Sequence, residues 1–389
     1  MGVEPSANVR VIASIAVTTC AIYGVCSTVI APDLNTFLFP WIEHIRTAGA
    51  VNAFGEPFGN YTPPYLYLLA IGTLLTDNSL VIVKALSVIS CGFAAIAVWR
   101  LVRTERNSIE AAAMSLLLPT MIIDGPLLGQ CDGIWVALCL LSVTAAIEGR
   151  MLAMVVWCGI AFAFKAQAAF IAPFVLTVLL HRRANIVLWI VPPAIYCIAM
   201  LPAWLAGWPA QDLATIYLRQ AEYFTTIGSS PGLWAIGAAT LPAKPIDLFL
   251  IGYAAGAIFV AAYIALLCRR TLSREQMLEA ALFSALALPF LLPKMHERFT
   301  LLADLLALSL AFIAPKRENG VIATAVVAAS STGYLAYMLA IDWLPIIGCA
   351  LNAWVLFELL RRLFRPKATM SQPLEIDQEA DPRAVNISA

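Results

Sequence analysis

The chain has 389 residues, of which 61% are hydrophobic and only 12% are charged. Soluble domains carry about 25% charged residues, so this composition excludes a soluble globular protein and indicates a chain solvated by lipid. Lysine plus arginine and aspartate plus glutamate both number 24, and this balance gives no reason to expect nucleic acid as a partner. The nine cysteines form no CxxC pair and lie mainly in apolar runs, which indicates packing residues.

Apolar runs recur along the chain, and they are expected to be helices because a helix satisfies its own backbone in lipid and these runs lack the alternation of a β-barrel. Long runs occupy residues 9–30, 185–205, 245–268, 321–340 and 343–360. Shorter runs occupy residues 63–75, 80–102, 134–147, 151–164, 168–180, 277–292 and 299–314. We therefore expect an all-α polytopic membrane protein with about 11–13 membrane helices. We expect them to form one transmembrane domain, residues 1–367, to which any catalytic activity would belong.

Basic residues in the short connections predict how these helices are oriented. Clusters of arginine and lysine lie at residues 181–183, 269–274, 316–317 and 361–367, each separated from the next by two spans. Short loops rich in these residues stay in the cytoplasm, so the clusters predict the cytoplasmic face and place both termini there. The opposite, outer face then carries the first loop, residues 31–62, and a long loop, residues 207–244.

The stretch between Asp33 and Asp132 contains three apolar pieces, and an odd number of crossings would put the two acids on opposite faces. One piece is therefore expected not to cross. Residues 111–123 are the best candidate, because the run is short and Pro119 interrupts it, as in a half-helix buried by its neighbours. The arginines of residues 100–106 would then face outward, against the positive-inside trend.

The first outer loop and the C-terminal tail have contrasting patterns. In the loop, apolar residues from Phe37 to Ile45 repeat at helical spacing, which predicts an amphipathic helix able to lie in the membrane interface. From residue 368 onward the composition turns polar and acidic. Residues 368–389 are therefore expected to be a disordered cytoplasmic tail.

Polar residues between apolar runs invite a functional interpretation, because they are costly near membrane depth. Five polar segments stand out, and all five map to the expected outer face. Their polar residues are Asp33; Asn60 and Tyr61; Gln130 and Asp132; Lys165 and Gln167; and Lys294, His296, Glu297 and Arg298. Arg219 in the long outer loop adds a further cation on this side.

Most of these segments also have a plain structural explanation. Asp33 can be an interfacial acid that ends a helix, and Tyr61 an interfacial tyrosine before a helix that begins with proline. The turn at residues 129–133 can cap the next helix, and Lys165 can extend its ammonium group to the bilayer surface. The run 294–298 fits such an explanation less well, because the positive-inside trend would send it inward. The convergence of all five segments on one face favours a site.

Two acids and several cations on one face suit a glycosyl transfer. A carboxylate can take the proton of a hydroxyl, and cations can neutralise a departing phosphate. With a lipid-linked sugar phosphate as donor, Asp33 would deprotonate an acceptor hydroxyl, and the anomeric configuration would invert in one displacement. The chain has no P-loop and no GxGxxG after a strand, so a donor carried in the membrane fits better than a nucleotide sugar.

The order of these motifs resembles that of the GT-C glycosyltransferases, which use polyprenyl-phosphate sugars. The matching segments are Asp33, the helix bearing Trp41, Tyr61 to Pro64, Gly129 to Asp132, Phe164 to Gln167, and Met295 to Phe299. The similarity is greatest to bacterial relatives of the GPI-anchor mannosyltransferase that adds the second mannose. It is weaker to the dolichyl-phosphate-glucose glucosyltransferases of N-glycan assembly.

The resemblance implies a GT-C-like helix bundle that acts as an inverting hexosyltransferase on the outer face of a bacterial inner membrane. The implied donor is a polyprenyl-phosphate hexose, expected to carry mannose, and the acceptor is a lipid or glycan hydroxyl. Asp33 is the implied catalytic base. With the charge pattern, the resemblance assigns substrate binding to Asp132, Gln130, Tyr61, Lys165, Gln167, Arg219, Lys294, His296, Glu297 and Arg298. Asn35 and Asn60 stand where some relatives carry acids, so we expect no metal and no other cofactor.

The alternative function is a transporter or flippase for an anionic or lipid-linked substrate. Transporters tend to carry inverted repeats and helices broken at mid-membrane, and this sequence has no internal repeat. Polar residues at mid-membrane would favour transport, whereas polar residues gathered at one face favour the enzyme. A third alternative is a catalytically silent subunit of a larger complex, against which the retained Asp33 argues.

Overall fold

The computed structural model describes residues 7–223, 229–240 and 246–365, and all regular structure in these ranges is helical. The first half of the chain contains α1 (Ala7–Cys26), η1 (Leu34–Leu38), α2 (Phe39–Ala48), η2 (Asn52–Gly55), α3 (Pro63–Leu75), α4 (Ser79–Val102), α5 (Ser108–Leu116), α6 (Pro119–Ile122), η3 (Ile123–Leu127), α7 (Asp132–Ile147), α8 (Met151–Phe164), η4 (Ala166–Ile171) and α9 (Ala172–His181). The second half contains α10 (Ile186–Ala206), α11 (Ala210–Tyr223), α12 (Trp234–Thr240), α13 (Ile246–Leu267), α14 (Arg274–Leu291), η5 (Glu297–Thr300), α15 (Leu301–Ile313), α16 (Arg317–Leu339) and α17 (Leu344–Leu363). The expected tail, residues 368–389, lies outside the described residues.

The lengths and composition of the helices make this a multi-pass membrane protein. Within the described ranges, five helices are long and apolar enough to cross a membrane: α4, α10, α13, α16 and α17. A sixth span results if α5 is joined to α6 and η3, which follow it after a bend of 51°. Five further apolar segments are 10–17 residues long. These come to 11 apolar segments, of which five or six are candidate spans, so the expected number of 11–13 membrane helices stays a prediction.

One end of the bundle, which we call the basic end, gathers the clusters of arginine and lysine. The contacts that tie these clusters together join His181 to the carbonyl of Cys268 at 3.0 Å, Arg270 to the carbonyl of Leu363 at 2.8 Å, and Lys316 to Glu275 at 2.8 Å. The four clusters therefore lie at one end of the bundle, as the spacing of the spans predicts.

The arginines in the last turn of α4 and directly after it also lie at the basic end. Arg100 and Arg103 pair with Glu148 after α7, at 2.6 and 3.2 Å, and Arg274 pairs with Glu105 at 2.9 Å. Because Arg274 belongs to a basic cluster, α4 ends beside that cluster. The expectation that these arginines face away from the other clusters is wrong, and their position agrees with the positive-inside trend.

The apolar helix that does not cross the bundle is α3, which begins and ends at the same end. The expectation that residues 111–123 are the piece that does not cross is therefore also wrong. Arg46 of α2 donates to the hydroxyl of Ser79 at 2.8 Å and to the carbonyl of Asp77 at 2.6 Å, so the turn after α3 lies beside the first outer loop. The bent segment that contains residues 111–123 instead leads from the basic end to the turn before Asp132. We call this opposite end of the bundle the site end.

Buried apolar side chains form a large cluster within the bundle and a smaller one at the site end. The smaller cluster contains Trp41, Ile42 and Ile45 of α2 together with Leu66 and Leu69 of α3. The amphipathic helix is therefore present where the pattern predicts it. Its apolar face, however, packs on the protein and is buried, rather than facing the membrane interface.

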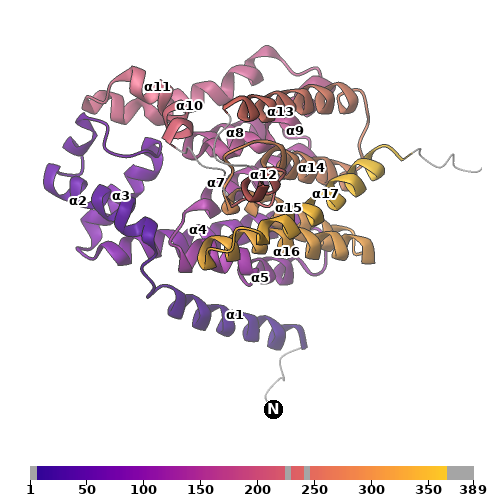
Figure 1. The fold of residues 1–389 in the computed structure, drawn as a ribbon, viewed down its shortest axis with the longest axis horizontal. Coiled ribbons are helices and arrows are strands. Elements are labelled where there is room, and N and C mark those ends of the chain that lie inside the picture. The colour runs from indigo at the N-terminus through magenta and orange to yellow at the C-terminus, as the bar shows by residue number, and fades with distance from the viewer. Residues whose placement is uncertain (1–6, 224–228, 241–245, 366–389) are drawn as a thin grey trace, which may run out of the picture.

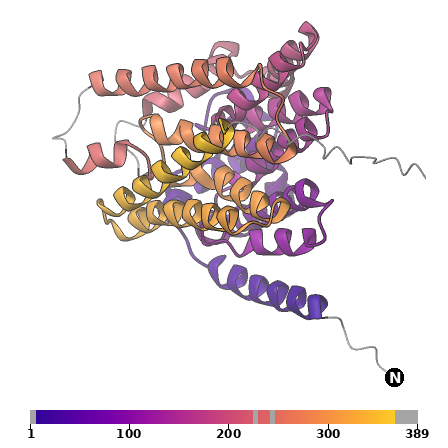
Figure 2. The same ribbon diagram turned by 90° about the vertical axis from the view of Figure 1, so that its right-hand side faces the viewer.

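The arrangement of the helices is visible in two views. Figure 1 shows α2, α3 and α11 gathered at one end of the molecule. In Figures 1 and 2, α1 lies at the edge of the bundle and α16 runs alongside α17. The hydroxyl of Tyr23 joins α1 to the carbonyl of Leu116 in α5 at 3.0 Å. The loops that follow α1, α8 and α14 meet at the site end.

Candidate active site

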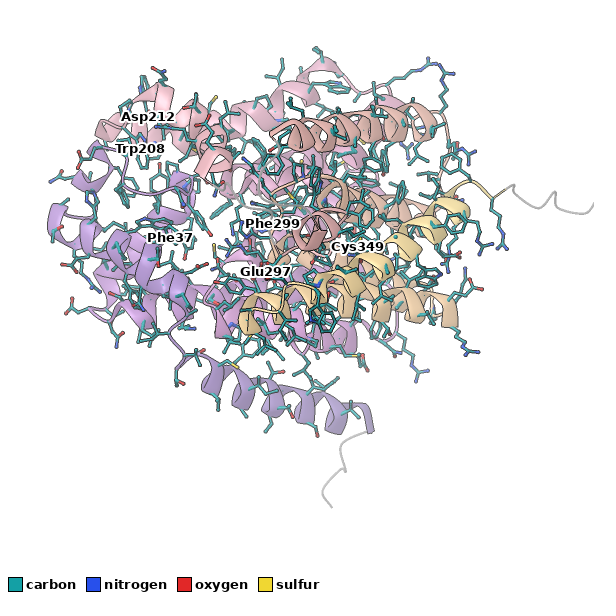
Figure 3. The ribbon with its side chains drawn as sticks, in the orientation of Figure 1. Phe37, Trp208, Asp212, Glu297, Phe299 and Cys349 are labelled. Carbon is teal, nitrogen blue, oxygen red and sulfur yellow. The ribbon has the colours of Figure 1, made fainter. Side chains whose placement is uncertain are left out.

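A polar cavity lies at the site end of the bundle. Its walls come from segments far apart in the sequence. The lining residues are Asp33, Phe37, Leu38, Trp41, Asn60, Tyr61, Gln130, Lys165, Gln167, Gln220, His296, Glu297, Arg298, Phe299 and Tyr337. Eight of the eleven residues that the sequence nominated therefore line one cavity. Figure 3 shows Phe37 at one side of the molecule and Glu297 and Phe299 nearer its centre.

The polar residues sit where helices are interrupted. Asp33 precedes the π-helix η1, a distorted helical form that is frequent at functional sites. Gly129 adopts a φ of +73°, which a glycine accepts easily and which turns the chain before Asp132. Lys165 has an extended backbone between α8 and η4. These breaks direct polar side chains inward from an otherwise apolar bundle.

Asp33 receives hydrogen bonds from three separate elements. Gln130 Nε2 donates to Asp33 Oδ2 at 3.1 Å, and Arg298 Nη1 donates to the same oxygen at 3.3 Å. The hydroxyl of Tyr337 lies 3.5 Å from Oδ1. The hydroxyl of Tyr61 donates to Gln130 Oε1 at 3.4 Å and extends the network. The carboxylate is thus held in place while 30% of its side chain stays exposed.

Asp132 is buried behind the cavity and forms an ion pair with Lys165. Lys165 Nζ lies 2.6 Å from Asp132 Oδ1, and Trp135 Nε1 donates to the same oxygen at 2.5 Å. Burial lowers the pKa of Lys165, but the Asp132 carboxylate, together with Tyr61 and Cys131, raises it by more, so that this pKa lies above its ordinary value. The ammonium also lies 4.8 Å from the centre of the Tyr61 ring. Lys165 is therefore a fixed cation in the cavity wall.

Arg298 connects the two acids. Besides its contact with Asp33, its Nε lies 4.0 Å from Asp132 Oδ2. The two acids therefore lie at the same end of the bundle, as a common site requires. His296 lies two residues before Arg298 and contributes no charge, because burial, with the charges of Arg298 and Lys165, lowers its pKa to about 3.

Four buried polar atoms around the cavity have no hydrogen-bond partner among the described residues. They are Asn60 Oδ1, Asp132 Oδ2, Gln167 Oε1 and Arg298 Nε. Buried polar atoms are normally paired, and an unpaired one costs about 1–3 kcal/mol. Three acceptors and one donor around one cavity suit a ligand that offers both hydroxyls and anionic oxygens. No group of three or more histidine, cysteine or acidic side chains in the described ranges is arranged to hold a metal ion.

An apolar groove of about 640 Å³ adjoins the polar cavity. The two share four lining residues: Gln167, Gln220, His296 and Phe299. The rest of the groove is mostly apolar, and its other lining residues are Ala166, Phe170, Tyr217, Ala221, Tyr253, Pro293, Lys294 and Met295. A ligand with a polar head and an apolar tail could therefore occupy both spaces continuously.

Three nominated residues do not line the polar cavity. Asp132 lies behind it, as described above. Arg219 pairs with Asp212 at 2.7 Å and is exposed, and Figure 3 shows Asp212 away from Glu297. Lys294 lines the apolar groove, where its Nζ donates to the carbonyl of Ala221 at 3.2 Å. Of the cations that the sequence places on this face, Lys165 and Arg298 therefore supply the positive charge of the polar cavity.

Two contacts of the site were missed in the sequence. Tyr337 of α16 approaches Asp33, and the hydroxyl of Ser229 in the long outer loop donates to Glu297 Oε2. A tyrosine near the end of an apolar helix is ordinary at a membrane interface, so Tyr337 gave little signal. A usable signal was its spacing of three residues from Tyr334, which places both hydroxyls on one face of α16.

Comparison with solved structures shows the fold of the chain. The structure is similar to the crystal structure of ArnT from Cupriavidus metallidurans bound to undecaprenyl phosphate, with a TM-score of 0.53 and 12% sequence identity. The match covers 92% of this chain and 77% of that chain. No protein-family model and no curated protein sequence matches the chain. At this identity the likeness bears on architecture, and it shows that the chain has the GT-C fold that its motif order predicts.

Proposed function

We propose that the protein is an inverting GT-C glycosyltransferase that moves a hexose from a polyprenyl-phosphate donor to an acceptor hydroxyl. Mannose is the expected sugar, from the resemblance of the motifs. The site end faces away from the cytoplasm, in the inner membrane of a bacterium. The proposal rests on the polar cavity, its pair of acids and the fold shared with ArnT.

The junction of the polar cavity with the apolar groove is the observation that carries the proposal. A polyprenyl-phosphate sugar has a polar head, which fits the cavity beside Arg298 and Lys165, and a long apolar chain, which fits the groove toward Met295. The residues common to both spaces, such as His296, would lie beside the phosphate. The ArnT structure with undecaprenyl phosphate supports a donor of this class.

The transfer proceeds in one displacement. Asp33 accepts the proton of the acceptor hydroxyl, whose oxygen forms a bond to the anomeric carbon from the face opposite the phosphate. The bond from that carbon to the phosphate oxygen breaks, and its electron pair stays on the polyprenyl phosphate. Arg298 then neutralises the additional negative charge. The products are an inverted glycoside and the lipid phosphate.

The remaining polar residues have positioning roles in this scheme. The ion pair with Asp132 fixes the side chain of Lys165, so that its ammonium group faces the donor in one position. Gln130 orients Asp33 through Oδ2. Gln167 Oε1 has no partner among the described residues and is an acceptor for a sugar hydroxyl. Enzymes gain rate from such preorganised groups because little rearrangement remains when charge develops.

Transport is the competing function, and the bent segment α5 to η3 is a feature that transporters also use. The charged residues of the site, however, gather at one end of the bundle and are linked through Arg298. A site at one surface suits transfer to an acceptor that arrives from outside the membrane, and this location favours the enzyme.

The test is transfer by the purified protein in lipid nanodiscs. Polyprenyl-phosphate mannose and polyprenyl-phosphate glucose, each labelled in the sugar, are incubated with lipid, polysaccharide and peptide acceptors. We expect label from one donor to appear in one acceptor fraction together with free polyprenyl phosphate. If both donors persist intact while vesicles containing the protein move labelled lipid between leaflets, the enzyme proposal is wrong and transport replaces it.

A further inference from the structure

The two oxygens of Asp33 have different surroundings. Oδ2 accepts hydrogen bonds from Gln130 and Arg298, at 3.1 and 3.3 Å. Within the described residues, the hydrogen bond to Oδ1 comes from Tyr337, at the long distance of 3.5 Å. Oδ2 is therefore committed to orienting the carboxylate, whereas Oδ1 keeps lone pairs for an incoming proton. The acceptor hydroxyl that supplies this proton would therefore lie beside Tyr337.

A row of hydroxyls along α16 fixes Tyr337 in this position. Ser330, Tyr334 and Tyr337 lie on one face of the helix. The Ser330 hydroxyl donates to Asp304 Oδ1 at 2.7 Å, and the Tyr334 hydroxyl donates to Asp124 Oδ1 at 3.2 Å. Both donors are fully buried, so these bonds hold the register of α16. The third hydroxyl, that of Tyr337, reaches Asp33 from a side chain that is 39% exposed.

The side of the cavity that holds Tyr337 is separate from the apolar groove. Asp33, Phe37 and Tyr337 line the polar cavity but not the groove. The groove instead meets the cavity at His296 and Phe299. Inverting displacement needs the acceptor and the leaving phosphate on opposite faces of the anomeric carbon. With the lipid in the groove, the acceptor approaches from the side of Asp33 and Tyr337.

This side of the cavity is rich in aromatic rings. The ring of Phe37 lies 6.1 Å from that of Trp41, and Trp41 lies 5.3 Å from Tyr61, measured between centroids. Aromatic rings offer apolar faces with little conformational freedom to lose, and Tyr and Trp also offer a polar edge. A pyranose ring matches such a wall, because its C–H face packs on the rings while its hydroxyls reach polar edges.

We propose that Asp33 Oδ1, Tyr337 and the rings of Phe37 and Trp41 form the acceptor subsite, and that the acceptor is a carbohydrate hydroxyl. This inference rests on the glycosyltransferase function proposed above. Tyr337 is a positioning residue: its hydroxyl donates to the acceptor oxygen and holds the acceptor proton toward Oδ1. The proton then passes to Asp33 as the oxygen bonds to the anomeric carbon, and Tyr337 keeps its own proton.

The test compares Tyr337→Phe with the wild type and measures the KM of the donor and the KM of the acceptor separately. The acceptor probes are octyl glycosides of mannose, glucose, galactose and N-acetylglucosamine, with a threonine-rich peptide as the competing acceptor class. We expect transfer to a glycoside and none to the peptide. Losing one hydrogen bond should raise the acceptor KM of Tyr337→Phe roughly tenfold. The donor KM should stay unchanged, because the donor binds in the groove and beside the cations rather than in the acceptor subsite.

Tyr334→Phe is the matched control, since it removes the neighbouring hydroxyl on α16 without touching Asp33. It should lower the thermal stability and leave the acceptor KM unchanged, because the Ser330 bond and the retained ring keep the register of α16. Equal acceptor KM values for Tyr337→Phe and the wild type would overturn the role of Tyr337, and transfer to the peptide would overturn the carbohydrate class. A wild type that neither transfers nor hydrolyses any donor would instead remove the proposed function, and the subsite with it.

Discussion

Lys165 Nζ lies 2.6 Å from Asp132 Oδ1, and both side chains are almost completely buried. Removing one partner of such a pair leaves an uncompensated charge in a medium that solvates it poorly. Asp132→Asn should therefore lower the free energy of unfolding by about 3–5 kcal/mol. Denaturant unfolding of the purified protein in micelles measures this loss.

The double variant Asp132→Asn with Lys165→Met is the control for this prediction. Because it removes both charges, it should recover most of the stability that either single change costs. Simple addition of the two single losses would show that the pair does not interact across the 2.6 Å contact.

Arg298 and Arg219 offer a comparison between a cation in the cavity and one outside it. Arg298→Gln should weaken the binding of polyprenyl phosphate about tenfold to a hundredfold, because a charged hydrogen-bond donor to the phosphate is lost. Arg219→Gln should bind the lipid as the wild type does, since Arg219 pairs with Asp212 on an exposed helix. Fluorescence titration of the lipid in nanodiscs measures both. Similar losses of lipid affinity in the two variants would show that Arg219 also belongs to the binding site.

His296 should stay neutral across the working pH range. Burial, aided by Arg298 and Lys165, lowers its pKa to about 3, against about 6.5 in an unfolded chain. Since the unfolded chain binds this proton more readily, stability should fall as the pH drops from about 6.5 toward 3, and His296→Gln should lessen that fall. The profile of kcat against pH should show no break from His296 between about pH 5 and 8. A break near pH 6.5 that disappears in His296→Gln would contradict the burial of this ring.

The crossing of α4 and α7 depends on Gly133. A Cβ added there would lie 2.4 Å from the carbonyl oxygen of Ser90, so Gly133→Ala must push the helices apart. We expect a loss of about 1–3 kcal/mol in unfolding free energy. Gly92→Ala is the control, because nothing lies within 4 Å of its added Cβ and alanine favours a helix interior. Equal effects of the two changes would show that α4 and α7 do not meet at Gly133.

The course of α3 can be tested by labelling single cysteines with a reagent that cannot cross the membrane. Asp77 lies beside the first outer loop, whereas Arg106 lies near the pair of Glu105 and Arg274 at the basic end. In intact spheroplasts, Asp77→Cys should gain label over the parent protein and Arg106→Cys should gain it only after lysis. Labelling of Arg106→Cys in intact spheroplasts, with Asp77→Cys labelled only after lysis, would restore a crossing by α3.

The sequence predicted the fold class and the meeting of the polar segments, because polar residues are rare in so apolar a chain and stand out wherever helices break. It did not predict the path of the chain between Asp33 and Asp132. Hydropathy registers that α3 is apolar, but it does not tell a helix that crosses lipid from one that packs on the buried face of α2. The bend before residue 119 could be predicted from Pro119. The return of α3 could not, because it depends on contacts of Arg46 in the folded chain.

Side-chain pairing was the other limit of prediction from sequence. Lys165, Arg219 and Lys294 are equivalent cations in a linear sequence, but their partners differ in three dimensions. One pairs with a buried acid, one with a surface acid of its own helix, and one with a backbone carbonyl. Tyr337 shows the converse, because an unremarkable interfacial residue contacts the proposed base through the register of α16.

The most direct test of the central claim compares Asp33→Asn with the wild type in a single turnover of polyprenyl-phosphate hexose. The exposed Asp342, at the same end of the bundle, supplies the matched control Asp342→Asn. We predict that Asp33→Asn binds the donor and unfolds at the wild-type temperature but transfers no sugar, while Asp342→Asn transfers normally. Transfer by Asp33→Asn at the wild-type rate would contradict the assignment of Asp33 as the base.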